Sequence, residues 1–138
     1  MKQENYGRVV GVDWSPRMVE TAIEEAERRG LEGRAAFQTV DIRRGLPFEE
    51  GEFDVVFCLG LLETLPQPEQ VLGELRRVLS PDGTMVLSLY RQGWSSKIVA
   101  LSLEWYKQHF AALGLGKVEV VSCRRSQDVV VVRSHGAR

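Results

Sequence analysis

Residues 7–26 read GRVVGVDWSPRMVETAIEEA, and this stretch decides the fold class. The apolar run from Val9 to Val12 is typical of a short buried strand, and Asp13 follows it directly. Ser15 is a good helix N-cap and precedes a proline that suits the first helical position. The stretch therefore predicts a strand, an acid at its carboxyl end, and a helix that Gly30 ends.

The rest of the chain continues to alternate strands with helices. Short apolar runs predict strands over 35–40 and 84–89, and helical spacing predicts helices after Pro68 and around Tyr106. Residues 53–59, FDVVFCL, are almost continuously apolar. Such a run is typical of a parallel strand that is covered on both faces.

Polar and glycine-containing segments separate these elements. SPDG at 80–83 predicts a turn before the strand that follows it. RRSQD at 124–128 joins predicted strands over 117–123 and 129–132, and so short a connection suits an antiparallel pair. LGLG at 113–116 is expected only to end the preceding helix.

The order β-α-β-β-α-β-α-β-β predicts an α/β open sheet, mostly parallel, with a C-terminal antiparallel hairpin. We expect residues 1–138 to form a single domain, because this length suits one hydrophobic core. In such sheets ligands bind beyond the carboxyl ends of the strands. Asp13, Asp41 and the segment 59–62 all follow predicted strands, which predicts a site where three loops converge.

Composition and charge narrow the classes of partner. The chain is 43% hydrophobic and 27% charged, with a net charge of −1, so no basic excess points to nucleic acid. No apolar run reaches the roughly 18 residues of a membrane span, and the N-terminus has no apolar signal-peptide core. We expect a cytoplasmic protein. Two cysteines and two histidines show no metal-ligand spacing, so we expect no metal site.

The two acids allow a specific interpretation and a plain one. A carboxylate at the end of an early strand can accept both hydroxyls of a ribose, which fits Asp13. Trp14 could lie against a purine ring or against the sheet, and Asp41 could accept from an exocyclic amine. Equally, each aspartate could only cap a turn or the following helix.

Two longer stretches resemble class I S-adenosylmethionine-dependent methyltransferases. Residues 7–26 are similar to the second strand and helix of that family, and residues 37–88 to its following segments through the fifth strand. The most specific part runs from LPF at 46 to PDG at 83 and is close to the branch that methylates quinones and other small molecules. The resemblance implies a Rossmann-like open sheet, S-adenosylmethionine as cofactor and a small-molecule substrate.

The resemblance also implies roles for individual residues. Asp13 matches the acid that binds the ribose diol, and Asp41 matches the acid that accepts from the adenine amino group. The other matching cofactor-binding positions are Trp14 and Met18 at the adenine, Ile42 beside Asp41, and Cys58, Leu59 and Gly60 under the methionine portion. Glu63 and Thr64 stand where related sequences often carry a histidine pair, and Glu63 is the candidate catalytic base if the reaction needs one.

The chain departs from the family upstream of Asp13. The family opens with a strand, a glycine-rich loop and a helix, and the 12 residues before Asp13 are too few to hold them. The family's sheet order is 3-2-1-4-5-7-6, so the first strand belongs at its centre. Strands 2 and 4 are then expected to pair directly, or a second copy or a partner chain supplies the missing strand. Residues 61–65 and 90–98 remain as a substrate wall.

Two functions follow from the match and the departure. The first is an N-terminally truncated small-molecule methyltransferase that works as a homodimer or with a partner chain. The second is a binding or scaffold module that keeps the methyltransferase fold without catalysis. A nucleotide-binding domain of another α/β family is a weaker third interpretation, because the segment 65–83 follows methyltransferases more closely.

Overall fold

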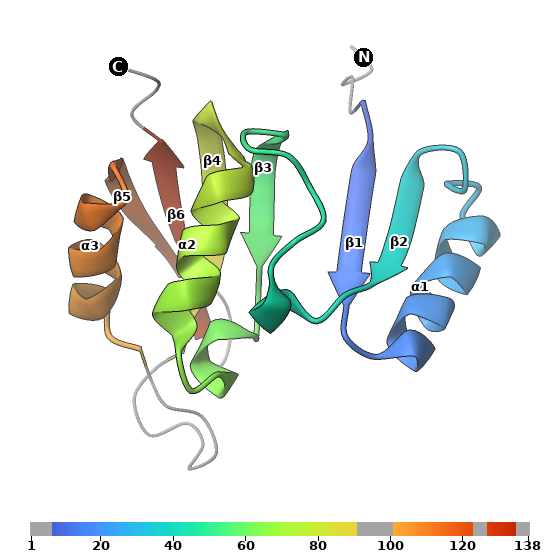
Figure 1. Ribbon diagram of the computed structural model, residues 1–138, viewed down its shortest axis with the longest axis horizontal. Coiled ribbons are helices and arrows are strands. Elements are labelled where there is room, and N and C mark those ends of the chain that lie inside the picture. Colours follow the sequence, from blue (N-terminus) through green and yellow to red (C-terminus); the bar gives the residue numbers. More distant parts are fainter. Residues whose placement is uncertain (1–6, 91–100, 123–126, 135–138) are drawn as a thin grey trace. The chain divides into compact units, whose positions relative to one another are not determined.

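The computed structural model describes residues 7–90, 101–122 and 127–134, and these form two compact units. The first unit spans Met1–Leu46 and the second spans Pro47–Arg138. Figure 1 shows the elements of both. The α/β class and the Rossmann-like open-sheet architecture are confirmed, while the expectation of a single domain stays a prediction.

The first unit is a β-α-β motif. It contains β1 (Val9–Asp13), α1 (Pro16–Arg28), β2 (Ala35–Thr39) and the short 3-10 helix η1 (Ile42–Arg44). β1 and β2 run parallel, with Asp13 opposite Thr39. The predicted helix start is confirmed, because the Ser15 hydroxyl accepts a hydrogen bond from the Met18 amide at 3.3 Å. Gly30, at φ +69°, allows the chain to leave the helix.

The hydrophobic core of the first unit is small. On the predicted inner face of α1, Val19 and Ala26 are buried, whereas Met18 and Ile23 are exposed. Val19 and Ala26 are the only buried apolar side chains among the described residues of this unit. A unit of this size with so few buried side chains depends on further contacts for its stability.

The second unit contains a four-stranded sheet with strand order β3-β4-β6-β5. Its elements in chain order are β3 (Phe53–Cys58), η2 (Leu62–Thr64), α2 (Pro68–Val78), β4 (Leu79–Tyr90), α3 (Leu103–Ala112), β5 (Leu115–Ser122) and β6 (Gln127–Ser134). β3 and β4 are parallel, and β6 is antiparallel to both β4 and β5. The predicted C-terminal antiparallel pair is confirmed, and its connection lies outside the described residues.

One face of this sheet forms the main core. The pairing register places Met85, Leu87, Val130 and Val132 on the same face, and none of them is exposed. The helices α2 and α3 contact β4 and β5, and Figure 1 shows them in front of the sheet. They add these buried side chains: Val71, Leu72, Leu75, Val78, Tyr106 and Phe110.

The other face of β3 is open, which corrects the prediction of a strand covered on both sides. Val55 and Phe57 point away from the buried face of the sheet, because successive side chains of a strand alternate between its two faces. They are 48% and 68% exposed. The apolar run at 53–59 therefore does predict a strand, but not its surroundings. The composition of β3 is that of a strand covered on both faces, but no described residue covers one of its faces.

The predicted turn at 80–83 is also corrected. These residues lie within β4, where the pairing with β3 jumps from Phe53–Leu79 to Val55–Thr84. The extra residues leave the ladder as an irregularity and do not end the strand. A Cβ at Gly83 would come within 2.5 Å of the Leu79 side chain, so a glycine suits this close approach.

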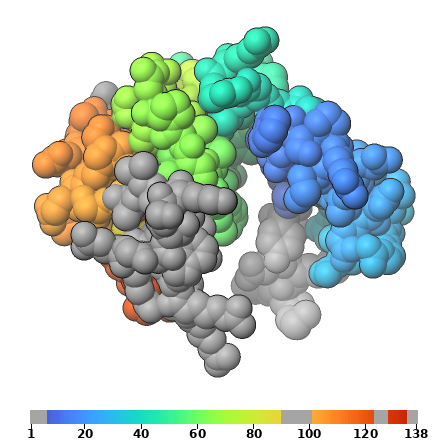
Figure 2. Space-filling model, turned by 90° about the horizontal axis from the view of Figure 1, so that it is seen from below, coloured from blue at the N-terminus to red at the C-terminus, as the bar shows by residue number. Residues whose placement is uncertain are grey.

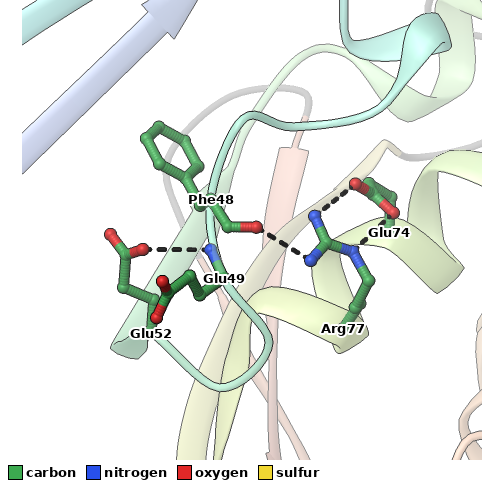
Figure 3. A network of polar contacts seen from close by, with 5 residues as sticks. All are labelled: Phe48, Glu49, Glu52, Glu74 and Arg77. Atoms are coloured by element: carbon green, nitrogen blue, oxygen red, sulfur yellow. Dashed lines mark hydrogen bonds and ion pairs between the residues drawn. The ribbon is translucent and has the colours of Figure 1, made fainter.

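A polar network ties the segment before β3 to α2, as Figure 3 shows. Arg77 donates from Nη1 to the Phe48 carbonyl at 2.8 Å and binds Glu74 through Nε and Nη2 at 3.0 and 2.7 Å. The Gly51 amide donates to the Arg77 carbonyl at 2.8 Å. These bonds place the start of β3 against the end of α2 within the second unit.

Each unit keeps one side of the expected family order. β2-β1 corresponds to one side and β3-β4-β6-β5 to the other, in two separate sheets. β1 and β3 correspond to strands 2 and 4 of the family order, and their direct pairing was one of three alternatives. The described residues do not contain this pairing. Within the same described ranges, no helix is both long and apolar enough to cross a membrane.

Candidate functional site

Asp13 lies at the carboxyl end of β1 and is half-buried. Its Oδ1 accepts a hydrogen bond from the Ser15 amide at 2.9 Å, so the carboxylate stabilises the turn into α1. Oδ2 has no hydrogen-bond partner among residues 7–90, 101–122 and 127–134. The side chain therefore acts as a local cap and still offers one free acceptor at the strand end.

Two apolar side chains beside Asp13 are exposed. Trp14 is 73% exposed and Met18, in the first turn of α1, is 56% exposed. Trp14 is therefore not buried in the core of the first unit. An exposed aromatic ring and a thioether next to a carboxylate can bind a flat heterocycle that carries hydroxyl groups.

Asp41 is bound by a neighbouring arginine. Its Oδ1 accepts from the amide and Nε of Arg43 at 3.1 and 2.9 Å, and its Oδ2 accepts from Nη2 at 2.9 Å. The hydrogen bond from the Arg43 side chain is the main reason that the pKa of Asp41 lies below its usual value. Asp41 thus caps η1, and Ile42, half-buried, is the first residue of that helix.

The parallel pairing of β1 and β2 brings the two aspartates to the same sheet end. The Val40 amide donates to the Asp13 carbonyl at 2.9 Å, and Asp41 is the next residue. β1 and β2 point downward in Figure 1, so Figure 2 is viewed from the side of their carboxyl ends. Asp13, Trp14, Met18, Asp41 and Ile42 thus belong to one end of the first unit.

The remaining predicted site residues belong to the second unit. Cys58 is buried at the end of β3, and Leu59 and Gly60 follow it and are exposed. Gly60 has φ +74°, a conformation that suits glycine, and its amide donates to Ser88 Oγ at 2.9 Å. This bond fixes the turn that follows β3 to the neighbouring strand β4.

Glu63, the candidate base, is only 3% exposed. Ser88 Oγ lies 3.2 and 3.4 Å from its two carboxyl oxygens and donates its one proton to this carboxyl group. Burial raises the pKa of Glu63, and hydrogen bonds from its own amide and from Ser88 partly oppose this. No salt bridge to Glu63 is present among the described residues, so the carboxyl group is held by hydrogen bonds rather than by a cation.

Ser88 and Tyr106 were not predicted as site residues. The Tyr106 hydroxyl donates to the Ser88 carbonyl at 2.8 Å, and both side chains are buried. Burial first, and then the nearby Glu63 carboxylate, raise the pKa of Cys58 to about 12. A serine inside the apolar strand at 84–89 was the available signal, because a buried hydroxyl needs a partner.

The nine predicted residues therefore form two groups, one in each unit. The structure brings five together at the end of β1 and β2, and four around the turn after β3. Of the predicted substrate wall, residues 91–98 lie outside the described ranges. Within those ranges no three potential ligand side chains gather as a metal site.

Comparison with known proteins identifies similar chains. Residues 1–87 match the family described as "Methyltransferase domain". Over 79 residues the chain is 43% identical to demethylmenaquinone methyltransferase of Thermus thermophilus, which covers 57% of this chain and 34% of that protein. The chain thus spans about a third of the length of this curated relative.

Solved structures show the same fold. The [4+2]-cyclase SpnF superposes with a TM-score of 0.80 at 18% identity, covering 94% of this chain and 67% of that one. A SAM-dependent methyltransferase from Aquifex aeolicus gives a TM-score of 0.74 at 20% identity, covering 91% and 68%. One of these two proteins is named as a cyclase, so the fold by itself does not define the reaction.

Proposed function

Because this chain belongs to the methyltransferase domain family, whose cofactor is S-adenosylmethionine, we propose that it is part of a methyltransferase that modifies a small molecule. The observation that carries this proposal is the half-buried Asp13 carboxylate beside the exposed Trp14 ring. Together they offer an acceptor and an apolar surface at the strand end where ligands of such sheets bind. The similarity to the demethylmenaquinone methyltransferase of Thermus thermophilus supports a quinone-type substrate.

The residues of the first unit fit the adenosine part of the cofactor. Asp13 Oδ2 is free to accept from a ribose hydroxyl, and Oδ1 could exchange the Ser15 amide for the second hydroxyl. Trp14 and Met18 would contact the adenine ring. Asp41 fits less directly, because it would have to share its oxygens between Arg43 and an amino group.

The turn after β3 would hold the methionine part, with Cys58, Leu59 and Gly60 below it. When bound, S-adenosylmethionine supplies a methyl group on a positively charged sulfur, which a nucleophile attacks in line. Orienting the substrate can supply much of the rate of such a transfer. The protein's task is then to place two molecules, and a general base is not essential to it.

We also propose that further protein completes the sheet. β1 and β3 each have one edge without a partner strand among the described residues, and Val55 and Phe57 leave an open apolar face. Unpaired edges and apolar faces of this kind favour association. More of the same polypeptide, a second copy of the chain or a separate partner could supply the missing strand.

A binding or scaffold module is the second candidate. It is favoured by the bidentate pairing of Asp41 with Arg43, which occupies an acceptor that the adenine amino group would use. In this case the fold would be kept for its surfaces.

Calorimetric titration with S-adenosylhomocysteine separates the two candidates. The cofactor proposal predicts saturable binding by the purified chain at up to millimolar ligand, followed by a screen for methyl acceptors. Light scattering on the same sample gives the assembly that binds. If no heat of binding is measured at millimolar ligand, the module without a cofactor is favoured.

A further inference from the structure

A closed polar cluster lies under the turn after β3. It consists of Cys58 from β3, Glu63 from η2, Ser88 from β4 and Tyr106 from α3, all buried. Four separate elements therefore direct polar side chains to one place in the core of the second unit. A buried polar group is costly unless it is hydrogen-bonded, so such a cluster needs a reason to be present.

Two hydrogen bonds connect Gly60 to Glu63 through Ser88, and both are donated in the direction of Glu63. The Gly60 amide donates to Ser88 Oγ at 2.9 Å, and Ser88 Oγ in turn donates to the Glu63 carboxyl at 3.2 Å. A serine hydroxyl has one proton, so the acceptor that takes this proton sets the direction in which its lone pairs point. Glu63 thereby fixes the acceptor that the Gly60 amide uses.

We propose that Glu63 is a positioning residue that acts through Ser88 to hold the Gly60 amide and the turn after β3. The inference rests on the proposed function, since this turn is where the methionine part of the cofactor would lie. It gives Glu63 a role other than a base, because its carboxyl is buried and accepts a hydrogen bond from Ser88. Glu63 then affects affinity through the shape of the turn.

Burial raises the pKa of Glu63, and its neighbours in the cluster do not titrate in the acid to neutral range. Cys58 and Tyr106 have pKa values raised by burial first and by the Glu63 charge second, so both stay protonated there. From α2, which also packs on η2, Arg77 binds Glu74 and the Phe48 carbonyl, and Arg76 donates to the carbonyls of Leu113 and Leu79. A pH-dependent change in the Gly60 amide below the range in which Cys58 and Tyr106 titrate thus reports on Glu63.

Amide exchange of the 15N-labelled full chain tests this without any ligand. We expect Gly60 to exchange at least about tenfold faster in Ser88→Ala and in Glu63→Ala, since each breaks the same path. Glu63→Gln keeps an acceptor for Ser88, so it should restore the slow exchange of the wild-type chain. The double variant should exchange no faster than either single one. Glu69→Ala, an exposed acid in the first turn of α2, is the control and should change nothing.

Ligand affinity then connects the cluster to the site. S-adenosylhomocysteine should bind about tenfold more weakly to Glu63→Ala than to the wild-type chain, and equally well to Glu63→Gln. If the wild-type chain binds no ligand, the proposed function fails, but the exchange data still decide the role of Glu63. Unchanged Gly60 exchange in Glu63→Ala would overturn the inference.

A pH series on the wild-type chain covers the case in which the variants do not fold. The Gly60 amide shift and the Glu63 carboxyl carbon shift should titrate together, with the same midpoint. If the Gly60 amide does not respond while the Glu63 carboxyl titrates, the two groups are uncoupled and the proposal is wrong.

Discussion

At the scale of single residues, Asp13 has one local task and a second, proposed one on the same carboxylate. One oxygen caps the turn into α1 through the Ser15 amide, and the other is free to accept from a ligand. The two interpretations of this residue from sequence, cap or ligand, are therefore compatible. Substitutions must separate them, because removing the whole side chain removes both.

Asp13→Asn separates the cap from the ligand site. Asparagine keeps an oxygen for the Ser15 amide but loses the charge and the second acceptor oxygen. We expect affinity for S-adenosylhomocysteine to fall about tenfold or more by calorimetry, with little change in thermal stability. Glu32→Ala, at an exposed acid in the turn before β2, is the matched control. Equal affinity of Asp13→Asn and the wild-type chain would show that Asp13 is only a cap.

Glu63→Gln should change how stability depends on pH. Burial raises the pKa of Glu63 in the folded state. Its contribution to the free energy of unfolding is therefore fully present below the pKa of the unfolded state, about 4.3, and is lost as pH rises through the pKa of the folded state. Glutamine cannot ionise, so the variant should gain stability relative to wild type as pH rises, and show no such gain at pH 4. Urea unfolding at several pH values measures this, with Glu32→Gln as control. Parallel pH curves for wild type and Glu63→Gln would contradict it.

At the scale of elements, the first β-α-β motif follows local sequence rules closely. Ser15 caps α1 and Gly30 ends it, as the sequence predicts. The pairing of β1 with β2 adds a contact between residues far apart in the sequence, which local sequence rules do not predict. Phe37 lies opposite Gly11 in the register, and its ring occupies the space that a Cβ on Gly11 would take.

Gly11→Ala should therefore weaken the pairing of β1 with β2. A Cβ there would come within 2.6 Å of the Phe37 ring, so the ring or the strand must move. We expect a loss of about 1–3 kcal/mol in the free energy of unfolding, measured with urea. The same substitution in a Phe37→Leu background should cost clearly less, because the smaller side chain can yield. An equal cost in both backgrounds would show that the ring is not the cause.

At the scale of the whole molecule, the predicted site is divided between two units. The residues expected at the adenosine belong to the first unit, and those expected at the methionine to the second. The second unit also has an open apolar sheet face at β3.

The open face of β3 predicts association. If a second copy covers it, light scattering should give a mass of twice 15.6 kDa for the wild-type chain. Phe57→Lys places a charge on that face and should return the mass to that of one chain. Val120→Lys, at an exposed position on the other edge strand, is the control and should leave the mass unchanged. A wild-type mass of 15.6 kDa would contradict a dimer through this face.

Local patterns in the sequence were sufficient for the element order, the start and end of α1, the C-terminal antiparallel pair and the family. These depend on caps, glycines and hydrophobic spacing, which act between residues close in the chain. The tertiary structure alone decided that Val55 and Phe57 are open, that Arg43 binds Asp41, and that Ser88 links Gly60 to Glu63. Exposure and side-chain pairing depend on which neighbours pack against a residue, and an apolar strand has the same composition whether one or both of its faces are covered.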